Sequence, residues 1–211
     1  MIRPKSVDRK ADSNWNDSNV LLLDYKKYIE SKKEKFNLTF IDLLYVSNFK
    51  GGNSTIKGNE KAINIVLKKY SVHFKKIDEI YGEKTLIDLN DFEKVELIKT
   101  IELTMKDLIE SHNINGFKYS YMSALLHAYF PNLLPILDRR ILINLGLVTI
   151  NDIDSTKQVK KIEQFYGSLV NKFIDILIAD KTKSIRNVDY ENFILELPHW
   201  AKNSRKIKYE K

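Results

Sequence analysis

The strongest constraint on the fold is a long run of apolar residues that are spaced three and four positions apart between Glu60 and Gly82. The members of this run are Ile63, Val66, Leu67, Tyr70, Phe74, Ile77 and Ile80. Because a helix completes one turn in about 3.6 residues, this spacing places them on one face, which another element must cover. The sequence therefore predicts a long amphipathic helix that begins at Glu60 and is ended by Gly82.

The rest of the chain also favours helices. Apolar residues recur at helical spacing in five further segments, which are 20–36, 91–112, 119–129, 152–180 and 188–197. A short apolar stretch at 38–49 ends at Gly51 and Gly52, a pair that breaks helices. No asparagine–glycine pair lies between two alternating apolar runs, so strand hairpins are not indicated. We predict an all-α protein, a multi-helix bundle arranged in two lobes.

The N-terminal residues 1–19 are polar and lack a continuous apolar pattern. We expect them to form a flexible arm or loop, followed by a single helical domain at 20–211. This arm has no apolar core of the kind found in signal peptides, and no segment approaches the roughly 18 apolar residues that span a membrane. We therefore expect a cytoplasmic protein that acts as a monomer and does not contact a membrane.

Composition limits the chemistry that the chain can carry. It has no cysteine, which excludes disulfides, zinc–thiolate sites and iron–sulfur clusters. The four histidines do not have metal-ligand spacing, so we expect no metal and no cofactor. The formal net charge of +7 and the sequence pI of 9.2 favour a polyanionic partner, nucleic acid first.

A glycine turn around Gly116 joins two of the predicted helices. Backbone amides at the start of the second helix, together with the helix dipole, favour an anion such as a phosphate. The residues placed to contact a DNA backbone are Asn113, Asn115, Gly116, Lys118 and Ser120. An ordinary helix–helix turn would show the same spacing.

The stretch PNLLPILDRRIL at 131–142 leads from an apolar, proline-containing segment directly into Asp138, Arg139 and Arg140. A stiff approach of this kind can hold one carboxylate in a fixed position. Asp138 can equally be a simple helix N-cap. The two arginines point about 100° apart on a helix, so we expect one to pair with a carboxylate and the other to reach a phosphate.

This arrangement resembles the helix-hairpin-helix DNA glycosylase superfamily. In that superfamily a hairpin precedes a helix, and a link then ends in an aspartate; the matching stretches here are INGFKYS at 114–120 and LLPILDRRI at 133–141. The phrase SALLHAYFPNLLPILDRRI is similar to the prokaryotic 8-oxoguanine DNA glycosylase-like branch, and IRNVDYENF at 185–193 resembles the C-terminal helix of that branch. The resemblance places the hairpin and the aspartate at about 105–145.

The resemblance implies that Asp138 is the catalytic residue of a base-excising enzyme. Cleavage of the bond between base and sugar gives the sugar oxocarbenium character, which an ionised carboxylate stabilises. Some members of the superfamily also cut the strand with a lysine on the hairpin's second helix. Ser120 falls at that position here, and Lys118 lies two residues earlier, where the pattern has its second glycine. We expect a monofunctional hydrolase, with Lys118 as the possible lyase nucleophile.

A flipped base needs a pocket with stacking faces and polar edges. The candidates for this pocket are Asn48, Lys50, Asn53, Tyr121 and His127. Each also has a simpler interpretation, as a surface turn, a packed aromatic residue or a buried histidine.

The sequence thus predicts a DNA glycosylase that hydrolyses the N-glycosidic bond of a damaged or modified base. Its expected partner is double-stranded DNA with one flipped base. The alternative is a non-catalytic nucleic-acid-binding protein or a phage-defence protein on the same fold. The missing second glycine and the missing lysine of the hairpin favour that alternative.

Overall fold

The computed structural model describes residues 6–51, 56–110 and 114–197, and within these residues the chain forms helices and isolated bridges but no β-strand. The helices are α1 (Arg9–Ser31), α2 (Phe40–Phe49), α3 (Glu60–Tyr81), α4 (Asp91–Glu110), α5 (Tyr119–Tyr129), α6 (Arg139–Asn144), α7 (Tyr166–Ala179) and α8 (Ile185–Ile194). The predicted all-α class is therefore confirmed.

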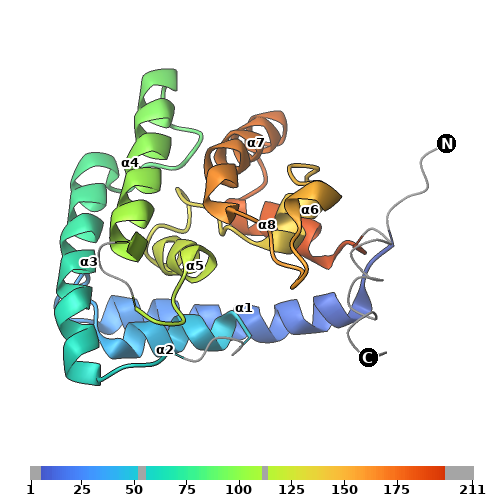
Figure 1. Cartoon of the computed structure of the whole chain (residues 1–211). Coiled ribbons are helices and arrows are strands. Elements are labelled where there is room, and N and C mark those ends of the chain that lie inside the picture. Colours follow the sequence, from blue (N-terminus) through green and yellow to red (C-terminus); the bar gives the residue numbers. More distant parts are fainter. Residues whose placement is uncertain (1–5, 52–55, 111–113, 198–211) are drawn as a thin grey trace, which may run out of the picture.

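The helices pack around one shared core (Figure 1). α1 and α2 lie side by side, α3 and α4 stand at one end of the molecule, and α6, α7 and α8 gather at the other. α5 lies between these groups, and seven of its residues from Met122 to Ala128 are buried in succession. Buried apolar side chains from α1 through α8 form one connected cluster, so the described helices fold around a common interior.

Local sequence signals set several of the helix ends. α3 begins after Asn59, whose side chain accepts a hydrogen bond from the backbone N–H of Lys61 at 2.9 Å. It ends at Gly82, which has a φ of 51° and donates its N–H to the carbonyl of Asp78 at 2.7 Å. A left-handed φ of this kind suits glycine, which has no Cβ. The helix predicted from Glu60 to Gly82 is confirmed.

The expected arm at 1–19 is corrected by the structure, because α1 already begins at Arg9. Asp8 caps the helix by accepting the N–H of Ala11 at 3.2 Å. Trp15 then buries its ring against Tyr190 and Phe193 of α8, with centroid distances of 5.6 and 5.3 Å. The apolar contacts are few and widely spaced along a polar segment, so periodicity alone did not reveal them.

The long helix expected at 152–180 is also wrong in its first half, since α7 begins only at Tyr166. Lys157 and Lys161 adopt positive φ values of 68° and 46°, which interrupt a helix. The Asp154 carboxylate accepts the backbone N–H groups of Thr156 at 2.8 Å and Gln158 at 2.9 Å. This local turn satisfies the backbone groups that a helix would otherwise use.

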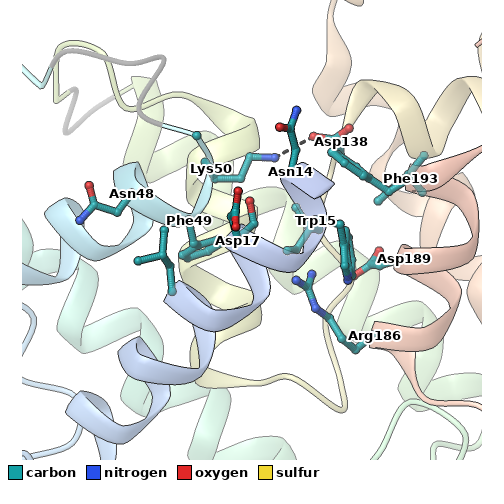
Figure 2. Close-up of a pocket in the computed structure, with 15 residues that line it drawn as sticks. Asn14, Trp15, Asp17, Asn48, Phe49, Lys50, Asp138, Arg186, Asp189 and Phe193 are labelled. Carbon is teal, nitrogen blue, oxygen red and sulfur yellow. Dashed lines mark hydrogen bonds and ion pairs between the residues drawn. The ribbon is translucent and has the colours of Figure 1, made fainter. Parts of the chain in front are cut away.

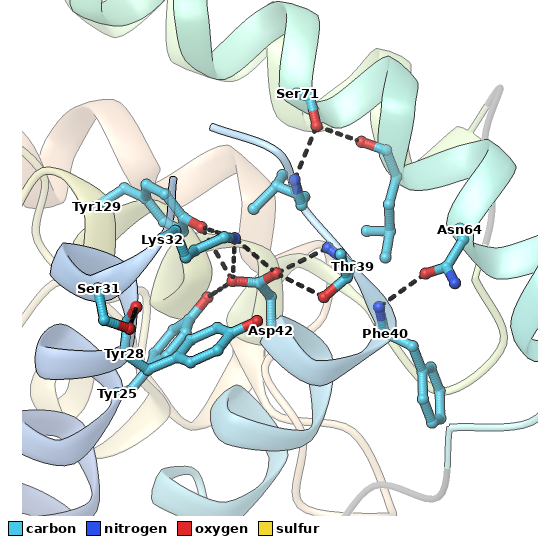
Figure 3. A network of polar contacts seen from close by, with 12 residues as sticks. Tyr25, Tyr28, Ser31, Lys32, Thr39, Phe40, Asp42, Asn64, Ser71 and Tyr129 are labelled. Atoms are coloured by element: carbon cyan, nitrogen blue, oxygen red, sulfur yellow. Dashed lines mark hydrogen bonds and ion pairs between the residues drawn. The ribbon is translucent and has the colours of Figure 1, made fainter. Parts of the chain in front are cut away.

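A buried carboxylate joins three of these helices (Figure 3). Asp42 of α2 is fully buried and accepts hydrogen bonds from the hydroxyls of Tyr25 and Tyr129, both at 2.9 Å. The ammonium of Lys32, directly after α1, lies 3.0 Å from both of its oxygens. The backbone N–H of Thr39 completes the set at 2.7 Å. The network therefore ties α1, α2 and α5 together through one charge.

We expect Asp42→Ala to lower the free energy of unfolding by about 3–5 kcal/mol, because it leaves the buried Lys32 ammonium without its counter-charge. Urea denaturation followed by circular dichroism would measure the change. The matched control is Asp78→Ala, which removes an exposed ion pair with Lys35 at 3.6 Å and should cost about 0–1 kcal/mol. Equal losses in the two variants would contradict a central role for the Asp42 network.

Candidate active site

Residues 133–137, which lead to Asp138, are irregular in structure and buried against α5; we call this segment the strut. Leu133, Leu134 and Leu137 are almost entirely buried. The backbone N–H of Leu137 donates to the hydroxyl of Ser123 at 2.9 Å, and the carbonyl of Leu134 accepts a hydrogen bond from Nδ1 of His127 at 2.8 Å. These two contacts fasten the strut at both ends of its apolar part, so the position of Asp138 is set by α5.

Asp138 has a separate donor for each of its carboxylate oxygens. Oδ1 accepts the backbone N–H of Arg140 at 2.8 Å, which makes Asp138 the N-cap of α6. Oδ2 lies 2.8 Å from the ammonium of Lys50, which follows the last residue of α2. Both side chains are largely buried, with 19% of Asp138 and 13% of Lys50 exposed.

These surroundings keep the Asp138 carboxyl ionised. Burial alone would raise its pKa, because a low-dielectric environment disfavours the charged form. The Lys50 ammonium and the N–H of Arg140 outweigh burial, and the pKa of Asp138 lies below its usual value of 3.8. The site therefore holds a fixed negative charge at neutral pH.

Asp138 and Lys50 line a cavity of about 470 Å³ (Figure 2). Its walls come from α1, the end of α2, the strut, the start of α6, and α8. The lining residues are Asn14, Trp15, Asp17, Ser18, Leu21, Asn48, Phe49, Lys50, Gly51, Ile136, Asp138, Ile141, Arg186, Asp189 and Phe193. Aromatic rings and charged side chains thus share one cavity, as is common in ligand sites.

The wall formed by α8 carries a second pair of charged residues, Arg186 and Asp189. The guanidinium of Arg186 stacks on the ring of Trp15 at 3.6 Å and donates from Nε to Asn19 at 3.2 Å. Asp189 is completely buried, and within the described part of the chain neither of its oxygens has a hydrogen-bond partner. Burial first, and then the nearby negative charge of Asp138, raise the pKa of Asp189 to about 8 against the attraction of Arg186.

Of the candidate residues from the sequence, three come together in this cavity: Asn48, Lys50 and Asp138. In Figure 2 the Asn48 amide points away from the Lys50–Asp138 pair, so Asn48 contributes to the wall only. Asn53 and Asn113 lie outside the described residues.

Tyr121 and His127 do not line the cavity. The Tyr121 ring lies 5.9 Å from that of Phe117, on the side of α5 that faces the hairpin. His127 is completely buried, and burial lowers its pKa to about 3, so it is neutral. Its hydrogen bond to the Leu134 carbonyl holds the strut in place. His127 is thus a buried histidine, the simpler alternative to a residue of the base pocket.

The two arginines after Asp138 both make contacts within the protein. Arg140 forms an ion pair with Asp8 at 3.1 Å and donates to the carbonyls of Phe193 and Leu195 at 2.8 and 2.9 Å. Arg139 donates from its guanidinium to the carbonyl of Lys157. Arg140 therefore connects α6 to the start of α1 and to the end of α8. Its ion pair with Asp8 is the expected pairing of one arginine with a carboxylate.

Residues 114–117, the part of the predicted hairpin that the structure describes, form a tight turn before α5. Ile114 and Phe117 are bridged and buried, and Gly116 has a φ of 87°. The carbonyl of Asn115 accepts the N–H of Lys57 at 3.2 Å, which ties the turn to the segment that follows Lys50. Lys118 is exposed at the N-cap of α5 and does not line the cavity. Ser120 lies in the first turn of α5, where its carbonyl accepts the hydroxyl of Ser123 at 3.0 Å.

Sequence reasoning missed the parts of the cavity that come from the two ends of the chain. Trp15 is one of only two tryptophans and stands in a polar segment, which was a usable signal. Arg186 and Asp189 are three residues apart, and this spacing puts them on one face of a helix. Neither signal indicates the cavity without knowledge of how α1 and α8 pack.

Comparison with protein-family models, curated proteins and solved structures gave no significant match. Across residues 6–51, 56–110 and 114–197, no group of three or more histidine, aspartate or glutamate side chains is placed to hold a metal ion. None of the helices described there has the length and apolar character needed to cross a membrane.

The pKa of Asp189 predicts how stability changes with pH. A carboxyl group whose pKa rises from 3.8 in the unfolded chain to about 8 in the folded protein stabilises the fold most at low pH. That contribution is lost as pH rises toward 8. We expect Asp189→Asn, which cannot ionise, to gain stability relative to the wild type by roughly 1.4 kcal/mol per pH unit between about pH 4 and 8.

Urea denaturation at several pH values would measure this difference. His127 acts in the opposite direction, since its contribution to stability is lost as pH falls from 6.5 toward 3, where the unfolded histidine takes up a proton and the folded one does not. It is present in both proteins, so its effect cancels. Asp175→Asn, an exposed change on α7, is the control and should follow the wild-type profile. A pH-independent difference for Asp189→Asn would show that Asp189 is already ionised in the folded protein.

Proposed function

We propose that the chain is a DNA glycosylase that hydrolyses the N-glycosidic bond of a damaged or modified base. The observation that carries this proposal is the ionised, largely buried Asp138 in a cavity lined by aromatic rings. The resemblance of residues 114–141 to the helix-hairpin-helix glycosylases supplies the reaction class. In this proposal α4, the hairpin and α5 form the DNA-binding element, and the cavity lies at the junction of two lobes.

The chemistry needs few groups. As the bond between base and sugar breaks, positive charge develops on the sugar, and a nearby carboxylate stabilises it. Asp138 has the required charge, and Lys50 and the N–H of Arg140 fix its orientation. The rings of Trp15, Phe49 and Phe193 give the cavity apolar wall area for a base that has left the helical stack, and Arg186 already covers one face of Trp15.

The position of the lysines supports a monofunctional hydrolase. Lyase chemistry requires a deprotonated amine beside the sugar. Lys118 is exposed and outside the cavity, and the Lys50 side chain is engaged by Asp138 at 2.8 Å. We therefore place base hydrolysis, without strand cleavage, at this site.

One observation favours a non-catalytic nucleic-acid-binding or phage-defence protein on the same fold. Both oxygens of Asp138 already have donors, so the Lys50–Asp138 pair can serve purely as a bridge between α2 and α6. A carboxylate used in this way would not need to face a substrate. Measurement of base release separates the two proposals.

We expect Asp138→Asn to reduce base release at least about 100-fold, because it removes the charge that stabilises the transition state. Purified protein would be incubated with plain, oxidised, alkylated and phage-modified genomic DNA, and released bases would be identified by mass spectrometry. Asp8→Asn is the control, since Asp8 is also an ion-paired N-cap but does not line the cavity. It should release base at close to the wild-type rate.

Release by Asp138→Asn at the wild-type rate would contradict the catalytic role of Asp138. If the wild-type protein binds DNA but releases no base from any of these substrates, the binding protein is the better description.

The hairpin makes a separate prediction about DNA affinity. An exposed lysine that contacts a phosphate releases about one counterion on binding. Lys118→Ala should therefore weaken binding to all duplex sequences alike and reduce the slope of log affinity against log salt by about 1. Lys75→Ala, an exposed change on α3, is the matched control and should leave the slope unchanged. Fluorescence anisotropy with a labelled duplex measures both, and identical slopes in the two variants would argue against the hairpin as the DNA contact.

A further inference from the structure

We propose that Asp189 is a second functional carboxyl group of this site and acts as the general acid that gives its proton to the leaving base. This inference rests on the proposed function and adds a residue to it. It starts from the fact that Asp138 and Asp189 line the same cavity, although they come from different elements.

Among the described residues, no hydrogen bond accounts for the placement of Asp189. Its side chain is completely buried in the middle of α8, and neither oxygen has a hydrogen-bond partner among the described residues. A buried polar group without a partner costs free energy in either protonation state, and native proteins keep few such groups. Asp189 is part of the cavity lining, but its oxygens are closed off from solvent, so a ligand supplies the missing partner only once the neighbouring side chains move aside.

The nearest cation does not neutralise Asp189. Arg186 lies one helical turn earlier, but it forms no ion pair with Asp189 within 4 Å, and it is engaged instead by the Trp15 ring and by Asn19. A protein that used Asp189 only for structure would gain from closing that pair. The open arrangement leaves a neutral acid beside the cavity.

The groups that face Asp189 come from several elements. Arg186 and Lys50 attract its negative charge, and Asp138 repels it. The hydroxyl of Tyr166 on α7 is also nearby, buried and without a hydrogen-bond partner among the described residues. Asp17 of α1 lies in the wall of the same cavity. Burial and Asp138 outweigh the two cations, so the proton stays on Asp189 at neutral pH.

Asp138 and Asp189, two of the three carboxyl groups that line the cavity, therefore have opposite protonation states. Lys50 keeps Asp138 ionised, whereas burial keeps Asp189 neutral. Enzymes that cleave glycosidic bonds often use such a pair, with the neutral carboxyl as acid and the ionised one as base or electrostatic stabiliser. The environments of the two residues favour Asp189 as the acid and Asp138 as the ionised partner.

The step balances with one water molecule. The bond between C1′ of the sugar and the base nitrogen breaks, and its electron pair goes to the base, which takes the proton of Asp189. The water oxygen forms a bond to C1′, and one water proton goes to Asp138. The products are free base and sugar hydroxyl, and solvent then carries the proton from Asp138 back to Asp189.

A comparison of leaving groups tests this role. Single-turnover base release would be measured from pH 5 to 10 on duplexes that contain 8-oxoguanine, hypoxanthine, uracil or 7-methylguanine. The first three bases are neutral in DNA and would leave as anions unless they received a proton. 7-Methylguanine is cationic in DNA and leaves as a neutral base without one. For the neutral bases that the wild-type protein releases, the rate should fall about tenfold per pH unit above about pH 8.

Asp189→Asn should lower the rate for those neutral bases by at least about 100-fold at pH 6.5 and remove the alkaline decline. Release of 7-methylguanine should change less than about tenfold. Asp175→Asn should retain the wild-type profile. Equal losses for cationic and neutral bases, release of 7-methylguanine alone by the wild-type protein, or an alkaline decline that persists in Asp189→Asn would overturn the acid role while leaving the glycosylase proposal intact.

A second measurement does not depend on turnover. The infrared difference spectrum between wild type and Asp189→Asn should show the carbonyl band of a neutral carboxylic acid at pH 6, and this band should disappear as pH rises through about 8. Absence of the band at pH 6 would overturn the assignment of Asp189 as an acid. If the wild-type protein releases no base at all, the proposed function falls and the acid role falls with it.

Discussion

The Asp42 carboxylate is the interaction on which the arrangement of α1, α2 and α5 depends. A buried charge is tolerated only when its hydrogen bonds are complete, and here two tyrosine hydroxyls, one ammonium and one backbone N–H meet that requirement. The donors come from the end of α1, the start of α2 and the end of α5. A shift of any of these helices would leave a buried group without its partner, so the network selects one packing among many of similar apolar area.

The candidate site inherits its geometry from that packing. α2 carries Lys50 at its C-terminal end, and α5 holds the strut that presents Asp138. Since Asp42 fixes α2 relative to α5, it also fixes the distance across which Lys50 meets Asp138. Asp42 lies in the first turn of α2 and Lys50 directly follows its last residue, so the Asp42 network and the Lys50–Asp138 pair lie at opposite ends of the same helix.

Asp42 and Asp189 show two uses of a buried carboxyl group. Asp42 has every oxygen satisfied and contributes to the unique packing of the helices. Asp189 has no hydrogen-bond partner within the described residues and therefore lowers stability as pH rises. A buried carboxyl group without a hydrogen-bond partner lowers the stability of the fold. Where such a group lies beside a cavity, a bound ligand that supplies the hydrogen bond would recover that stability.

The sequence by itself determined the all-α class, the limits of α3 and α5 and the start of α4, because these depend on local periodicity and capping. It also singled out Lys50 and Asp138, but from separate patterns. Only the tertiary structure decided that these two residues, 88 positions apart, form one ion pair. The helix at 9–19 and the turn at 154–161 were misjudged because a few distant contacts, or one side-chain cap, outweighed local preference. Trp15, Arg186 and Asp189 meet at the cavity for the same reason: α1 packs against α8 although the two helices are far apart in the sequence, and no local pattern encodes which distant helix will cover a given face.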